Sequence, residues 1–256
     1  MRPLILVTND DGVHAPGVIA LFKAMKELGD AYLVAPDRER SAVGHALTLH
    51  RPLKAEELRE QVFSVNGTPT DCVALGVHKL LPRKPDLIAS GINNGANLGD
   101  DITYSGTVSA AMEGTILGVP SFAISVTGNR PFYYDTAIPF AIEVGAYILE
   151  KSLPYDTLLN VNVPNVLKRD LIKGIKITKQ GKRVYDGSIQ EVYSPWGDKH
   201  FWIGGGTPYW EQGEDMDMQA VLDNYVSVTP IHLNLTNYDA MDYLKKTWGR
   251  GENSKS

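Results

Sequence analysis

Residues 4–12 read Leu-Ile-Leu-Val-Thr-Asn-Asp-Asp-Gly, and this stretch decides the fold. Leu4–Thr8 is an apolar run that turns polar at once, which is typical of a buried β-strand. Pro16 opens a segment whose apolar residues recur at the spacing of a helix packed on a sheet, and Gly29 ends it. Residues 32–35 form the next apolar strand. A strand, a helix and a strand in this order favour parallel pairing through a right-handed crossover.

The same alternation of apolar runs and helical patterns continues to about residue 165. Exposed strands or a hairpin are expected at 46–50 and 62–65, and buried strands at 86–90, 120–126 and 158–163. Helices are expected at 70–81, 107–117 and 137–149. The predicted fold class is therefore α/β, with a doubly wound, mostly parallel sheet.

Residues 166–256 have a different pattern. Strands are expected at 172–178 and 225–230, a helix at 238–248, and a mobile polar tail at 249–256. The stretch 184–206 is rich in Tyr, Trp and Gly and contains turn signals, which together predict a long β-hairpin. We expect one domain over 1–256, with a core at 1–165 and a C-terminal extension at 166–256.

Four aromatic residues lie in the predicted hairpin, with little chain left to cover them: Tyr193, Trp196, Phe201 and Trp202. One interpretation is that they pack back on the core. The other is that they form a contact between subunits, because large exposed apolar patches usually mark binding surfaces. The sequence leaves both interpretations open.

Composition restricts the class of protein further. The chain has 256 residues, 43% hydrophobic and 21% charged, a balance that excludes intrinsic disorder. A formal net charge of −5 argues against a nucleic-acid polymer as partner, and an anionic substrate then needs local positive charge such as a metal ion. Cys72 is the only cysteine, which excludes an intrachain disulfide and a Cys-rich zinc site. No stretch approaches the roughly 20 apolar residues of a membrane span, so we expect a soluble, cytoplasmic protein.

Polar loops follow three of the predicted strands. They are residues 9–12, residues 36–41 running on to His45, and residues 91–101. Parallel α/β sheets bind their ligands at the carboxyl ends of their strands, and all three loops fall on that edge. We therefore expect their side chains to form one site.

Asp10 and Asp11 are the centre of this predicted site. Neighbouring carboxylates repel each other, and a fold tolerates the repulsion at a strand end mostly when a cation lies between them. An ordinary turn is the alternative, because Asp-Asp-Gly is common turn chemistry. Ser41 and Asn93 supply oxygen donors from the other two loops. A ligand set made only of oxygen favours Mg²⁺ or Mn²⁺ over zinc or copper.

Ser105, Gly106 and Thr107 precede a predicted helix. Their hydroxyl groups, with the free N–H groups at the positive end of the helix, would form a phosphate-binding pocket. Helix capping alone is the alternative explanation for these residues.

Two further features have open roles. His45 has the chemistry to protonate a leaving group or to hydrogen-bond a phosphate, but a purely structural histidine is at least as plausible. Asp100 and Asp101 form a second acidic pair that competes for the metal, although it lies further from its strand end. Other catalytic templates are missing: the chain has no Walker A loop, no dinucleotide-binding glycine fingerprint after the first strand and no Gly-x-Ser-x-Gly elbow.

Five motifs in order resemble the SurE survival-protein family of nucleotidases. They are Val-Thr-Asn-Asp-Asp-Gly at 7–12, Ala-Pro-Asp-Arg-Glu-Arg-Ser at 35–41, Asn-Gly-Thr-Pro-Thr-Asp-Cys-Val at 66–73, Ser-Gly-Ile-Asn at 90–93 and Tyr-Ser-Gly-Thr-Val at 104–108. The resemblance is colinear through about residue 130. It implies a Rossmann-like core and a C-terminal hairpin that is exchanged between the subunits of a homodimer or tetramer.

The resemblance also implies a metal-dependent hydrolase of nucleoside 5′- and 3′-monophosphates. The ligands of one divalent ion per subunit, Mg²⁺ or Mn²⁺, would be Asp10, Asp11, Ser41 and Asn93. We expect this ion to activate a water for attack on the phosphate, with one aspartate accepting the proton of the water.

We expect Asn97 and the start of the helix at Ser105–Thr107 to hold the other phosphate oxygens. His45 is a candidate proton donor to the leaving group, and Tyr104 a candidate for stacking on the base. A broad-specificity acid phosphatase, an exopolyphosphatase and a non-catalytic nucleotide-binding stress protein remain alternatives.

Overall fold

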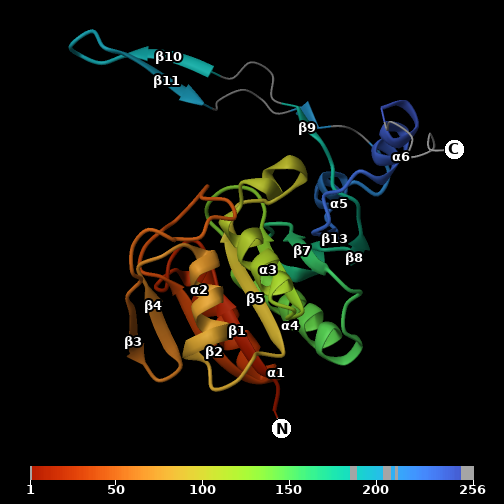
Figure 1. Ribbon diagram of the computed structural model, residues 1–256. Coiled ribbons are helices and arrows are strands. Elements are labelled where there is room, and N and C mark those ends of the chain that lie inside the picture. The colour runs from red at the N-terminus through yellow and green to blue at the C-terminus, as the bar shows by residue number, and fades with distance from the viewer. Residues whose placement is uncertain (1, 185–188, 204–208, 211–212, 249–256) are drawn as a thin grey trace, which may run out of the picture.

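The central element is a nine-stranded sheet, seen in a computed structural model that describes residues 2–184, 189–203, 209–210 and 213–248 (Figure 1). In sheet order the strands are β3 (Ala55–Arg59), β4 (Val62–Val65), β2 (Asp30–Pro36), β1 (Leu4–Thr8), β5 (Leu87–Asn94), β6 (Ser121–Val126), β7 (Thr157–Val163), β13 (Val226–His232) and β8 (Ile175–Ile177). The strands from β4 across to β7 pair in parallel, whereas β3 and β13 run antiparallel to β4 and β7. The chain runs outward from β1 to β2 and β4, and in the other direction from β5 to β6 and β7. The order in which the chain adds strands therefore reverses between β1 and β5. Doubly wound folds bind their ligands at this switch point.

Helices cover both faces of this sheet. The helices of the described residues are α1 (Pro16–Leu28), α2 (Pro69–Leu75), α3 (Gly106–Ile116), α4 (Tyr134–Lys151), α5 (Asp217–Leu222) and α6 (Tyr238–Thr247), with short helical turns at Gly76–Leu80, Gly99–Thr103 and Arg169–Leu171; α6 buries no residue and lies away from the sheet. Helices α1 and α4 pack on one face, and α2 and α3 pack on the other. Within the described residues, no helix combines the length and the apolar content that a membrane span needs.

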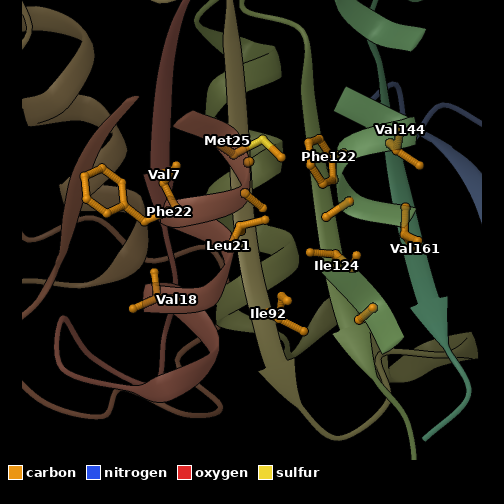
Figure 2. Packing of buried hydrophobic residues seen from close by; sticks show 14 of the residues in the cluster. Val7, Val18, Leu21, Phe22, Met25, Ile92, Phe122, Ile124, Val144 and Val161 are labelled. Atoms are coloured by element: carbon orange, nitrogen blue, oxygen red, sulfur yellow. The ribbon is translucent and has the colours of Figure 1, made fainter. Parts of the chain in front are cut away.

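The larger core cluster lies between the sheet and the helices α1 and α4 (Figure 2). Leu21 and Met25 of α1 are fully buried there, together with Ile92 of β5 and with Phe122 and Ile124 of β6. Burying a side chain of this size contributes about 2 kcal/mol. The core thus holds β1, β5 and β6 in fixed positions, and the loops at their carboxyl ends project from a rigid base.

The doubly wound α/β fold confirms the prediction from sequence, but the strand expected at 46–50 is wrong. This segment is an irregular loop in which Leu49 is 84% exposed, and Thr48 donates its N–H and its hydroxyl to Asp71. The antiparallel neighbour of β4 is instead β3, which is exposed along its whole length and has no apolar alternation.

The C-terminal segment contributes to the sheet through β8 and β13, and it also forms the predicted hairpin. Strands β10 (Ile189–Tyr193) and β11 (Lys199–Ile203) pair antiparallel and reach away from the core (Figure 1). Nearer the core, β9 (Arg183–Val184) pairs with β12 (Tyr209–Trp210). Trp196 is 87% exposed and Trp202 is 67% exposed, so the interpretation that these aromatic residues pack back on the core is wrong. The tail expected to be mobile, 249–256, lies outside the described residues.

Candidate active site

A cavity of about 720 Å³ opens at the carboxyl edge of the sheet, beside the neighbouring strands β1 and β5. Its walls are the loops that follow β1, β2, β5 and β6. Six of the predicted metal and phosphate ligands line this one cavity, and so does Tyr104: the six are Asp10, Asp11, Ser41, Asn93, Asn97 and Ser105. The structure therefore brings the three predicted loops together.

Asp10 is buried and is held from two sides. Thr107 donates its hydroxyl to Oδ1 of Asp10 at 2.5 Å, and the backbone N–H of Arg40 donates to the carbonyl of Asp10 at 2.7 Å. Gly106 lies so close that a Cβ atom there would be 2.8 Å from the Cβ of Asp10. Burial raises the pKa of Asp10, and the hydrogen bond from Thr107 opposes this rise.

Asp11 has a pKa raised to about 6, first by burial and then by the negative charges of Asp10 and Glu39. Its Oδ2 atom is buried and has no hydrogen-bond partner among the residues that the structure describes. A buried carboxylate oxygen of this kind is costly unless a ligand satisfies it. A divalent cation would satisfy Oδ2 and also relieve the repulsion between the two carboxylates.

Ser41 and Asn93 complete the set of oxygen donors. The hydroxyl of Ser41 donates to Oε1 of Glu39 at 2.6 Å, and the amide of Asn93 donates to the carbonyl of Gly95 at 2.9 Å. The hydroxyl hydrogen of Ser41 and one amide hydrogen of Asn93 are thus used on protein atoms, and both side-chain oxygens can still coordinate a cation. In the described part of the chain, no cluster of three or more His, Cys, Asp and Glu side chains forms a metal site. Two carboxylates, a hydroxyl and an amide oxygen fit a hard ion such as Mg²⁺ or Mn²⁺.

The predicted phosphate-binding residues divide into two groups. Ser105 caps α3 by accepting the N–H of Val108 at 3.1 Å, and its hydroxyl lines the cavity. Asn97 also lines the cavity, and it donates one amide hydrogen to Ser125 at 2.8 Å, which leaves its second for a ligand. Gly106 and Thr107 do not line the cavity, because they pack against Asp10.

His45 lies outside the lining of the cavity. Its Nε2 is 2.8 Å from Oε2 of Glu113, a buried carboxylate on α3. This contact ties the loop after β2 to the helix that carries Ser105. The role of His45 as a proton donor stays a prediction.

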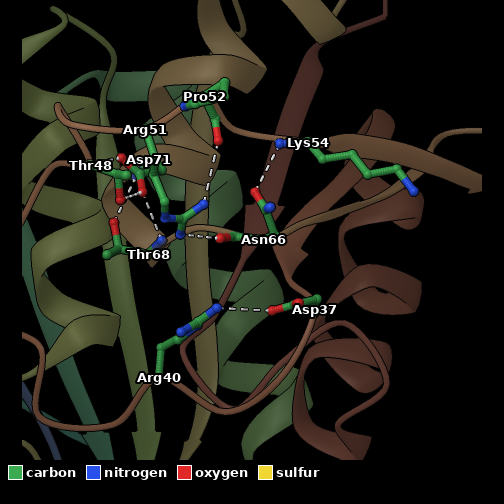
Figure 3. Close-up of polar contacts among 9 residues, drawn as sticks. All are labelled: Asp37, Arg40, Thr48, Arg51, Pro52, Lys54, Asn66, Thr68 and Asp71. Carbon is green, nitrogen blue, oxygen red and sulfur yellow. Dashed lines mark hydrogen bonds and ion pairs between the residues drawn. The ribbon is translucent and has the colours of Figure 1, made fainter.

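The loop after β2 is anchored by polar contacts that involve the motif at 66–73 (Figure 3). The carboxylate of Asp71 accepts the N–H of Thr68 at 2.9 Å and the hydroxyl of Thr48 at 2.6 Å. Arg40 pairs with Asp37 at 3.2 Å in the same loop. This motif therefore fixes the loop that carries Ser41 rather than lining the cavity itself.

The C-terminal segment reaches the site through a buried carboxylate. Asp217 accepts the N–H groups of Gly99 at 2.8 Å and of Gly181 at 3.0 Å, and Gln180 donates to the carbonyl of Gly99 at 3.1 Å. Gly99 begins the turn that leads to Ser105. The base of the extension is thus bound directly to a loop of the site.

Sequence reasoning missed the wall formed by the loop after β6. Asn129, Arg130 and Phe132 line the cavity from this side, and Glu39 lines it from the loop after β2. The strand-end rule could have found the first three, because β6 was predicted and its carboxyl end lies on the same edge of the sheet.

The fold and this cavity define a class of protein: a doubly wound α/β protein with an acidic, oxygen-lined site at the switch point of its sheet. A family model described as survival protein SurE matches residues 5–187. The chain belongs to the SurE family.

Known relatives resemble this chain over nearly its whole length. The 5′-nucleotidase SurE of Geotalea daltonii is 54% identical over 243 residues, which cover 94% of this chain and 98% of that protein. The 5′-nucleotidase SurE of Geobacter metallireducens is 53% identical over 249 residues, with 97% and 98% covered. The crystal structure of the SurE protein from Aquifex aeolicus matches with a TM-score of 0.85 at 45% identity, covering 95% of this chain and 99% of that one. The similarity therefore includes the C-terminal extension as well as the core.

Proposed function

We propose that this chain is a metal-dependent nucleotidase, a phosphoric monoester hydrolase that releases phosphate from nucleoside monophosphates. One observation carries the proposal: the unpartnered, buried Oδ2 of Asp11 beside the buried carboxylate of Asp10 at the switch point of the sheet. The relatives that bear the name 5′-nucleotidase are about half identical to this chain over nearly its whole length, which supports the same activity here.

Four side chains would hold the divalent ion, Mg²⁺ or Mn²⁺: Asp10, Asp11, Ser41 and Asn93. Such an ion supplies charge neutralisation at the phosphate and lowers the pKa of a water molecule. Thr107 orients the carboxylate of Asp10 through its hydrogen bond, as partners of metal ligands commonly do. An aspartate of the pair is the candidate acceptor for the proton of the attacking water.

The start of α3 and Asn97 would hold the phosphate. Ser105 and the second amide hydrogen of Asn97 are donors of the right kind, and the positive end of α3 adds to their attraction. Tyr104, which is 63% exposed and lines the same cavity, is placed to stack on a base. Stacking of this kind tolerates several bases, so monophosphates of different bases are proposed as substrates. Both 5′- and 3′-monophosphates are included in the proposal. The cytoplasmic location stays a prediction.

We also propose that the chain forms a homo-oligomer through its hairpin. Tyr193 and Phe201 are exposed on one face of the hairpin, and Trp202 is exposed on the other. A two-stranded hairpin alone is marginally stable in water, so exposed aromatic residues on both faces favour a covering partner. A second copy of the chain is that partner in the proposal.

Phosphate release from purified protein tests the nucleotidase proposal. We expect turnover of adenosine and guanosine monophosphates, loss of activity with EDTA, and recovery when Mn²⁺ or Mg²⁺ is added. Asp11→Asn should abolish turnover, whereas the control Asp170→Asn, at an exposed position, should not. Binding of nucleotide without hydrolysis would instead support a stress protein. Faster turnover of non-nucleotide monoesters or of polyphosphate would support the other phosphatase activities.

A further inference from the structure

The cavity is unusually acidic for a site that receives an anion. The acidic residues Asp10, Asp11 and Glu39 line it. Among the lining residues that the structure describes, Arg130 is the only Lys, Arg or His. A phosphate dianion that enters this cavity meets more negative charge than one divalent ion neutralises, so it needs a further cation.

Arg130 has the position and the freedom to supply that charge. It lies on the loop between β6 and α4, and it forms no hydrogen bond or ion pair with any described residue. Its positive charge acts on Asp11, where it lowers the pKa, and on Tyr134 in the same way. The guanidinium group thus lies within electrostatic reach of Asp11, and Arg130 lines the same cavity as both aspartates.

The backbone that carries Arg130 is held in place by Asn165. The amide of Asn165 donates to the carbonyls of Asn129 and Pro131, each at 2.9 Å, and accepts the N–H of Tyr133 at 3.0 Å. These bonds fix the loop on both sides of Arg130. A side chain presented from a fixed loop loses less entropy when it binds a ligand.

We propose that Arg130 binds the phosphate group of the substrate from the wall that the loop after β6 forms. This proposal rests on the nucleotidase function and adds a substrate-binding residue to it. The planar guanidinium group offers paired N–H donors that match two phosphate oxygens, and a charge-assisted bond of this kind is stronger than a neutral one. Arg130 thus compensates for the carboxylates that surround the site.

Steady-state kinetics of Arg130→Gln and Arg130→Lys with two substrates test this role. Adenosine monophosphate and p-nitrophenyl phosphate share the phosphate group but not the nucleoside. We expect Arg130→Gln to lower kcat/KM by the same factor for both, about tenfold to a hundredfold, and Arg130→Lys to retain part of the activity. Arg59→Gln, which removes the same charge from the exposed strand β3, should leave both values unchanged.

Binding of inorganic phosphate to the Mn²⁺-loaded protein, measured by calorimetry, gives a readout that does not depend on turnover. We expect the affinity for phosphate to fall in Arg130→Gln, while thermal unfolding stays as in the wild type and Mn²⁺ affinity does not fall. A loss restricted to adenosine monophosphate would mean that Arg130 contacts the nucleoside, and would overturn the proposal. Unchanged kinetics and unchanged phosphate affinity would mean that the side chain of Arg130 is only solvated, and would also overturn the proposal. If the wild type binds phosphate but hydrolyses neither ester, the nucleotidase proposal fails instead.

Discussion

Thr107 shows how a single hydroxyl outside the lining of the cavity holds a side chain that lines it. Its hydrogen is donated to Asp10 at 2.5 Å, and its side chain is fully buried. The sequence correctly places Thr107 at the start of a helix beside the site, but not the direction of its hydroxyl. That direction depends on the close packing of α3 against Asp10, which the absence of a Cβ at Gly106 permits.

The substitution Thr107→Val keeps the shape of this side chain and removes the hydrogen bond. Because the carboxylate of Asp10 then loses its orienting partner, we expect metal affinity or kcat/KM to fall about tenfold to a hundredfold. Titration with Mn²⁺ and phosphate-release kinetics measure the two quantities. Thr107→Ser keeps the hydroxyl and serves as the control, with values near those of the wild type. Equal activity and metal affinity in Thr107→Val and the wild type would show that the hydrogen bond is dispensable.

At the scale of single residues, the sequence predicted polar side chains at the carboxyl ends of β1, β2 and β5. Asp11 after β1 and Ser41 after β2 are examples, because strand ends are readable from a change of apolar to polar residues. Arg130 could not be found in this way. Its importance comes from the charges of distant residues around one cavity, and only the folded chain brings these together.

Elements were predictable where burial leaves an apolar run or an apolar period in the sequence. Strand β1 has the predicted bounds, Leu4–Thr8, since all five of its residues are buried. The edge strand β3 was missed because its residues are all exposed and carry no apolar signal. Helix α5 was also missed, because it is only six residues long.

Asp86, directly before β5, joins the beginnings of β1 and β5, and its charge should contribute to the stability of the protein. Oδ2 of Asp86 accepts the N–H of Leu4 at 2.7 Å and pairs with Arg83 at 2.7 Å. The hydrogen bond from Arg83 is the first reason that the pKa of Asp86 lies below its usual value. The resulting stabilisation is present above the usual pKa and is lost as pH falls through the lower folded value.

Asp86→Asn removes this charge and should therefore destabilise the protein at neutral pH but not in strong acid. The effect should be within about 1 kcal/mol, because solvent screens this partly exposed pair. Urea unfolding of both proteins from about pH 7 to about pH 2 measures the difference in the free energy of unfolding. A difference that grows toward acid pH would contradict the assignment.

On the scale of the whole molecule, the exposed hairpin is the feature that a single chain does not explain. Figure 1 shows β10 and β11 extending away from the sheet, and the aromatic side chains of the hairpin are exposed. The sequence predicted the hairpin from its composition and turns. It could not decide between core packing and exposure, because that depends on where the chain leaves the sheet.

The double substitution Phe201→Ser with Trp202→Ser removes an aromatic residue from each face of the hairpin. We expect the oligomer to dissociate, with a smaller molecular mass in sedimentation velocity at micromolar concentration, because apolar burial drives such association. The core should stay folded, since neither residue contributes to it. Tyr155→Ser is the control, at a position that is 98% exposed outside the hairpin. An unchanged mass in the double variant, or a monomeric wild type, would refute the proposed interface.

The central claim is that three loops enclose one divalent ion at the switch point of the sheet. Anomalous diffraction from a crystal soaked in Mn²⁺ tests it most directly. We expect one manganese peak per subunit within about 2.3 Å of oxygens from Asp10, Asp11, Ser41 and Asn93. A strong peak elsewhere, or none in this cavity at saturating Mn²⁺, would contradict it.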